Sequence, residues 1–134
     1  RSVDVIYASH LIAYWDRTEV LDLLSEWYDK LVPGGILRIA TPDFSILSKF
    51  HEVGLDLDKL LGPMYGKMPM GSKTIYHKTV YNETSLVKIL ESCGFTNVVR
   101  YDHTKTDHAH VDDHSMAYIN STLISLNMEA TKPI

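Results

Sequence analysis

The sequence is poor in cysteine and in long hydrophobic runs. Its 134 residues include one cysteine, Cys93, so no disulfide can form within the chain and no multi-thiolate zinc site is available. A single thiol suits a reducing compartment. No apolar run approaches the ~18 residues that a membrane span requires, and no basic, apolar leader opens the sequence. We therefore expect a cytoplasmic protein with no membrane partner.

Clustered positive charge is also missing. The 13 basic residues are scattered, 17 residues are acidic, and the net charge is −4 with the seven histidines neutral. Binding to nucleic acid through a broad basic face needs clustered lysine and arginine, so we expect no nucleic-acid partner. Apolar residues make up 45% and charged residues 22%, which is typical of a folded globular chain. We expect residues 1–134 to form a single domain.

The first forty residues have the pattern of a strand, a helix and a second strand. Residues 3–8 are a short β-branched run. From Val20 to Leu31 the apolar residues recur at the spacing of one helix face, after a capping pattern at Asp16. Pro33-Gly34-Gly35 ends that helix, and residues 36–40 form the second apolar run. The pattern predicts a βαβ unit with parallel strands.

The rest of the chain predicts more helices and two further strands. Two helices are expected to begin after the N-capping residues Asp43 and Asn82, and a third is expected to start at Asp58. Residues 66–79 show no clear period, so we expect a long loop there. Residues 98–101 predict a strand. Residues 124–130 alternate apolar and polar, which predicts a strand with one buried face, antiparallel to its neighbours, and a solvated Glu129.

Three segments occur in a characteristic order. They are Val3–His10 (VDVIYASH), Leu31–Ala40 (LVPGGILRIA) and Cys93-Gly94-Phe95. Together they resemble the second half of class I S-adenosylmethionine-dependent methyltransferases, in which an L-x-P-G-G turn leads into a strand. The segments 61–66, 76–80 and 123–130 resemble the type that modifies small molecules or sugars. The fold expected is therefore α/β, a partial Rossmann-like sheet with a parallel βαβ unit and a C-terminal antiparallel strand, flanked by helices.

The glycine-rich cofactor turn of that family is missing from this sequence. Family members begin with a strand, a glycine-rich turn and a helix, whose backbone N–H groups approach the cofactor. The glycines here, at positions 34, 35, 54, 62, 66, 71 and 94, form no G-x-G turn between a strand and a helix. The resemblance thus implies the C-terminal portion of a methyltransferase that acts on a small molecule. Its cofactor is S-adenosylmethionine, which we expect the isolated chain to bind weakly or not at all.

The resemblance implies cofactor contacts at the end of the first strand. Ala8, Ser9 and His10 would lie near the methionine part of S-adenosylmethionine. Ligands in parallel α/β sheets bind outside the carboxyl ends of the strands, which favours this position. The alternative is that Ser9 and His10 only satisfy backbone groups where the strand ends.

The resemblance also implies contacts with a small-molecule acceptor from the loop that follows the middle helices. Tyr65, Tyr76 and His77 are the residues concerned. His77 is a candidate general base because its ordinary pKa lies near neutrality. Methyl transfer often needs little beyond alignment of the reacting atoms, so a base is not required by the chemistry. An ordinary polar loop with aromatic packing is the alternative.

A histidine- and aspartate-rich segment raises the possibility of a metal site. Its members are His103, Asp107, His108, His110, Asp112, Asp113 and His114. Residues at i and i+2 point to opposite sides of a strand, and the helical H-E-x-x-H spacing is missing. We therefore expect a solvated loop with capping aspartates and no metal, and keep a His/Asp metal-binding protein as an alternative.

The first strand suggests a further alternative. The chain begins at Arg1, without methionine and directly before the strand, so we expect a fragment or a processed chain. Without a preceding partner strand, residues 3–8 would present a bare, apolar edge. Two copies related by a two-fold axis would pair these edges antiparallel. The alternative function is then a stand-alone, non-catalytic homodimeric module that joins through Val3–Ala8.

Overall fold

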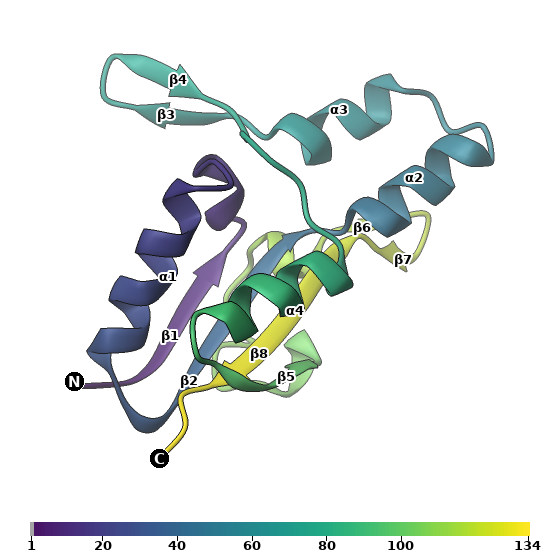
Figure 1. The fold of residues 1–134 in the computed structure, drawn as a ribbon. Helices are drawn as coiled ribbons and strands as arrows, with labels where there is room; N and C mark the ends of the chain where they lie inside the picture. Colours follow the sequence, from purple (N-terminus) through teal and green to yellow (C-terminus); the bar gives the residue numbers. More distant parts are fainter. Residues whose placement is uncertain (1) are drawn as a thin grey trace.

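The computed structural model describes residues 2–134 and is built on a four-stranded mixed sheet (Figure 1). Its strand order is β1 (Val3–Ser9), β2 (Leu31–Pro42), β8 (Ser125–Thr131) and β5 (Thr96–Arg100). Strands β1 and β2 are parallel, and β8 runs antiparallel to both β2 and β5. The predicted α/β fold, with a parallel βαβ unit and a C-terminal antiparallel strand, is confirmed.

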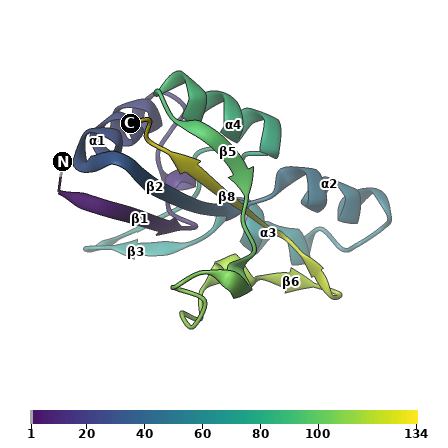
Figure 2. The same ribbon diagram turned by 90° about the horizontal axis from the view of Figure 1, so that it is seen from below.

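Two helices cover one face of this sheet. They are α1 (Glu19–Lys30) and α4 (Glu83–Ser92), which lie on the same side of the strands in Figure 2. The Asp16 side chain accepts hydrogen bonds from the backbone N–H groups of Thr18 and Glu19 at the start of α1. Asn82 forms a capping box with Ser85 at the start of α4. The apolar faces of both helices pack on the sheet and form the main core.

Two further helices extend from the carboxyl end of β2. They are α2 (Phe44–Glu52) and α3 (Asp58–Tyr65), and they share a small apolar cluster of Leu47, Leu60 and Ile124. The Asp43 carboxylate accepts from the backbone N–H of Ser45, so the predicted cap is confirmed. No helix among residues 2–134 has the length and hydrophobicity to cross a membrane.

The expected long loop at residues 66–79 is wrong in part, because it contains a hairpin. Strands β3 (Met68–Met70) and β4 (Lys73–Ile75) pair antiparallel. Gly71 has φ of +63° in the two-residue turn between them, a conformation that glycine adopts without steric cost. Most of the hairpin's side chains are exposed, so neither strand carries the alternation that reveals a half-buried strand.

The expectation of a single buried face on β8 is also wrong. Residues 102–117 cross the second face of the sheet and include the short helices η2 (His103–Lys105) and η3 (His114–Met116). Below this cover, Ser125 and Asn127 are each only 2% exposed. Glu129 is not simply solvated, because its Oε1 lies 2.8 Å from Nε of Arg38. A further hairpin, β6 (Tyr118–Ile119) with β7 (Thr122–Leu123), leads into β8.

Candidate functional site

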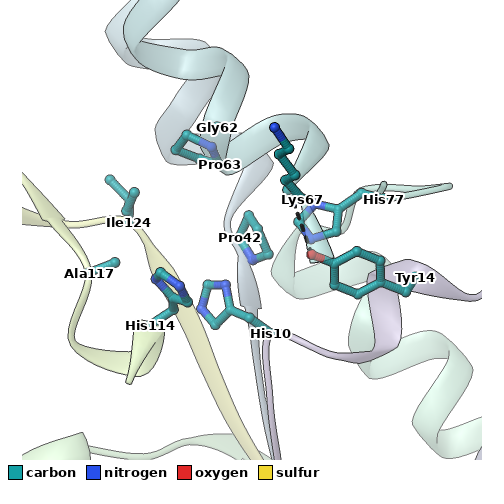
Figure 3. Close-up of a pocket in the computed structure, with 11 residues that line it drawn as sticks. His10, Tyr14, Pro42, Gly62, Pro63, Lys67, His77, His114, Ala117 and Ile124 are labelled. Atoms are coloured by element: carbon teal, nitrogen blue, oxygen red, sulfur yellow. Dashed lines mark hydrogen bonds between the residues drawn. The ribbon is translucent and has the colours of Figure 1, made fainter. Parts of the chain in front are cut away.

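A pocket of about 410 Å³ opens at the carboxyl ends of the parallel strands β1 and β2. Figure 3 shows His10 and His114 on one side and Tyr14, His77 and Lys67 on the other. Much of the remaining lining is apolar. The full set is His10, Tyr14, Pro42, Gly62, Pro63, Gly66, Lys67, His77, His114, Ala117 and Ile124. The volume lies in the range of small-molecule sites, and the position is where open α/β sheets bind ligands.

His10 is held in place from both backbone and side chain. Its φ of +51° is uncommon for a residue with a side chain, and its backbone N–H donates to the Ala40 carbonyl at 2.6 Å. Its Nε2 lies 2.8 Å from the Ser125 hydroxyl. Ser125 Oγ lies 2.7 Å from Asn127 Oδ1, and Asn127 Nδ2 donates to the Ser115 carbonyl at 3.0 Å. A buried polar chain therefore connects His10 to β8 and η3.

Burial sets the charge of His10. Loss of solvation is the main cause that lowers the pKa of the His10 imidazole to about 3, and charge on the neighbouring His114 and His77 contributes to this shift. The His114 ring lies beside it, with 5.4 Å between ring centroids. His10 is therefore uncharged at neutral pH. It is also a poor general base, because an effective base has a pKa near the working pH.

His77 is fixed by a backbone carbonyl. Its Nδ1 donates to the Met64 carbonyl at 3.1 Å, since a carbonyl can only accept. The Tyr14 ring meets it edge-on at 4.6 Å between centroids. A Cβ at Gly66 would lie 2.5 Å from His77 Nε2 and 2.7 Å from Tyr14 Oη, so only glycine fits there. Burial lowers the pKa of His77, which leaves Nε2 without a proton at neutral pH.

Only some of the site residues predicted from the sequence come together at this pocket. His10 and His77 both line the pocket, although they are far apart in the chain. Ala8 is packed in the core with 5% exposure, and the buried Ser9 hydroxyl has no hydrogen-bond partner among residues 2–134. Tyr65 and Tyr76 are 56% and 49% exposed and lie outside the lining set.

Tyr14 and His114 are among the lining residues that the sequence did not predict for this pocket. Tyr14 belongs to η1 (Ile12–Tyr14), and its hydroxyl accepts from the backbone N–H of Lys67 at 3.2 Å. His114 belongs to the histidine- and aspartate-rich segment, where the sequence suggests only a possible metal ligand. No periodicity or motif marks these positions, because long-range folding brings them to His10 and His77.

The histidine- and aspartate-rich segment is divided among separate contacts. Asp113 accepts from the Tyr7 hydroxyl at 2.5 Å, the His108 ring stacks on Tyr7 at 3.8 Å, and Asp107 pairs with Arg38 at 2.9 Å. Across residues 2–134, no three histidine, cysteine, aspartate or glutamate side chains are placed to hold a metal ion. The segment serves as the cover of the second sheet face.

Comparison with known proteins gives relatives by structure alone. No family model and no curated protein sequence matches the chain. The S-adenosylmethionine-dependent methyltransferase SibL matches over 100% of this chain and 33% of its own length, with TM-score 0.60 and 17% identity. A possible exported protein from Bordetella parapertussis matches over 99% and 40%, with TM-score 0.60 and 18% identity. Human N-acetylserotonin methyltransferase, solved with S-adenosylmethionine, matches over 100% and 30%, with TM-score 0.55 and 15% identity.

The chain has a methyltransferase-type fold. It spans only 30% of the human enzyme and 63% of a putative methyltransferase from Listeria monocytogenes. It therefore corresponds to part of that fold. At these identities the likeness concerns architecture, and activity has to be argued from the site.

Proposed function

We propose that this chain supplies the acceptor-binding part of an S-adenosylmethionine-dependent methyltransferase that acts on a small molecule. The observation that carries the proposal is the pocket at the carboxyl ends of β1 and β2, in a chain that covers part of a methyltransferase-type fold. Residues 1–134 would act as one unit whose cofactor contacts are incomplete. Alone, the chain would bind the cofactor weakly or not at all and would not transfer methyl groups.

The cofactor would meet this chain at the end of β1. Ala8, Ser9 and His10 are the proposed contacts, because they stand at the carboxyl end of β1, where open α/β sheets bind ligands. The residues present fit one side of the cofactor only, because residues 2–134 hold no glycine-rich turn between a strand and a helix. When bound, S-adenosylmethionine supplies an electrophilic methyl group on its sulfonium.

The acceptor would occupy the pocket next to His77. Pro42, Pro63 and Ile124 offer apolar surface to hold it and exclude water. His77 Nε2 would hold the proton that the acceptor gives up, since Nδ1 is already committed to Met64. The exposed rings of Tyr65 and Tyr76 would pack against the outer part of the acceptor.

Calorimetric titration of S-adenosylmethionine tests this function. An extended protein that also contains a glycine-rich strand–helix turn should bind with micromolar affinity, and residues 1–134 alone should show no saturation below the millimolar range. Lack of binding by an extended protein that contains a glycine-rich strand–helix turn would contradict the proposal. Micromolar binding by the short chain would place the cofactor site within these residues and contradict the division of roles.

A non-catalytic homodimer is the second candidate, and one observation favours it. Strand β1 lies at the open edge of the sheet, and Val5 within it is 39% exposed. Two copies would pair their β1 strands antiparallel across a two-fold axis. Size-exclusion chromatography with light scattering decides the matter, because a monodisperse monomer at high concentration excludes this dimer.

A further inference from the structure

We infer that the pocket selects uncharged ligands that donate a hydrogen bond from a hydroxyl group, for which His10 Nδ1 and His77 Nε2 are the available acceptors. The ligand class is an alcohol or a phenol. The inference rests on the proposed function and names the chemical class of its acceptor. Ser125 and Asn127 are positioning residues, which act on the ligand only through His10.

The Ser115 carbonyl fixes the positions of the protons in the hydrogen-bonded series that links it to Asn127, Ser125 and His10. The Ser115 carbonyl can only accept, so the Asn127 atom facing it is Nδ2 and the atom facing Ser125 is Oδ1. Oδ1 can only accept, so the single hydroxyl proton of Ser125 points to Asn127. Ser125 Oγ is then the acceptor for His10, and His10 Nε2 carries a proton.

The uncharged His10 ring has one proton, and this proton is on Nε2. Its Nδ1 therefore presents a lone pair. On the other side of the pocket, Nδ1 of His77 donates to Met64, so its Nε2 presents a lone pair in the same way. Both imidazoles thus offer a hydrogen-bond acceptor, and a ligand must bring the donor.

The residues that line the pocket disfavour charged ligands. Among residues 2–134, no aspartate or glutamate lines the pocket, and its one permanent charge is the exposed Lys67 ammonium. An ammonium ligand would enter without a counter-ion, which is costly where Pro42, Ala117 and Ile124 exclude water. A carboxylate ligand would bring only acceptors to two acceptor nitrogens. An uncharged hydroxyl compound meets neither penalty.

Four small probes of similar size test the selection on the ¹⁵N-labelled chain at pH 7. Phenol donates from a hydroxyl, anisole carries the same ring and oxygen without the donor, benzoate is an anion and benzylamine is a cation. NMR titration should show phenol shifting the ring nitrogens of His10 and His77, with the other three at least roughly tenfold weaker. Equal affinity for anisole, tighter binding of benzoate or benzylamine, or no response to phenol would overturn the inference.

The proton positions are tested without any ligand. Imidazole ¹⁵N shifts of the unmodified chain should report His10 protonated at Nε2, and protonation at Nδ1 would overturn the inference. In Ser125→Ala the two ring forms should mix, and Ser125→Thr should restore the single form. Thr41→Val, which removes a buried hydroxyl without a partner in the described part of the chain, is the matched control and should leave His10 unchanged.

These outcomes are separable from those of the cofactor titration. Selective phenol binding with no cofactor binding by the extended protein would defeat the methyltransferase proposal alone. Cofactor binding with no preference for phenol would defeat the ligand class alone.

Discussion

The two faces of the sheet are held by different interactions. On the face covered by α1 and α4, Ile6, Leu37 and Met128 belong to one apolar cluster. On the face covered by residues 102–117, Tyr7, Arg38 and Glu129 stand side by side on neighbouring strands and take part in hydrogen bonds and ion pairs. The polar face also carries Ser125 and Asn127, and through them it reaches the pocket. Stability thus comes mainly from one face, while the other connects to the site.

The largest effect should come from the apolar face. Leu24 on α1 is fully buried, so Leu24→Ala should lower the free energy of unfolding by roughly 2–5 kcal/mol, because it removes buried methyl groups and leaves a cavity. Leu21→Ala on the same helix is the matched control, since Leu21 is 38% exposed. Urea denaturation measures both. Equal effects of the two variants would contradict the view that burial of the apolar side of α1 on the sheet stabilises the fold.

Lowering the pH should destabilise the fold through the buried histidines that adjoin the polar face of the sheet. The pKa of folded His10 is about 3, against 6.5 in an unfolded chain, so below pH 7 the unfolded chain binds more protons and stability falls as the pH falls. Between pH 7.5 and pH 5, His10 should lower the free energy of unfolding by about 2 kcal/mol. Burial lowers the pKa values of His77 and His108 and acts in the same direction. Urea midpoints that stay constant over this range would contradict the account, and His10→Gln should reduce the slope.

Breaking one contact of the polar cover should cost less. Asp113 accepts from the Tyr7 hydroxyl and from the backbone N–H of Ser115, so Asp113→Ala should lower the free energy of unfolding by about 1 kcal/mol. Hydrogen exchange should quicken in residues 103–116 and stay unchanged in α1. Asp112→Ala, next to it and exposed, should have no measurable effect. Global loosening by Asp113→Ala would show that the two faces do not differ as described.

The smallest expected effect is a gain in stability from replacing Thr41. The Thr41 hydroxyl is fully buried, and no hydrogen-bond partner for it occurs in residues 2–134. Thr41→Val keeps the shape and removes the unpaired group, so the free energy of unfolding should rise by about 0.5 kcal/mol. Thermal melting is sensitive enough to detect it. A clear loss of stability would show that the hydroxyl has a partner after all.

The comparison of faces also explains what the sequence could predict. The apolar face follows from helix periodicity and β-branched runs, so the βαβ unit and the antiparallel last strand were predictable. The second face was not, because a segment rich in histidine and aspartate has the composition of a solvated loop. Its burial depends on pairings such as Tyr7 with Asp113, which are 106 residues apart. No local sequence pattern indicates a contact between residues so far apart in the chain.

The candidate site likewise has residues that the sequence predicted and residues that it did not. His10 and His77 were identified because one ends a strand and the other follows the middle helices. Tyr14 and His114 join them only through the tertiary fold, and Tyr65 lies outside because its helix directs it to solvent. The chain of Ser125 and Asn127 could not be predicted, since period-two alternation places both residues on the face expected to meet water.

Chemical-shift mapping of S-adenosylmethionine on the ¹⁵N-labelled chain tests the central claim most directly. At millimolar cofactor we expect weak, unsaturated shifts of the Ser9 and His10 amides and of their pocket neighbours. Residues 103–108, on the far face of the sheet, should not respond. Shifts concentrated in residues 103–108, or saturation at micromolar cofactor, would contradict the claim that this chain contributes only one side of a methyltransferase site at the end of β1.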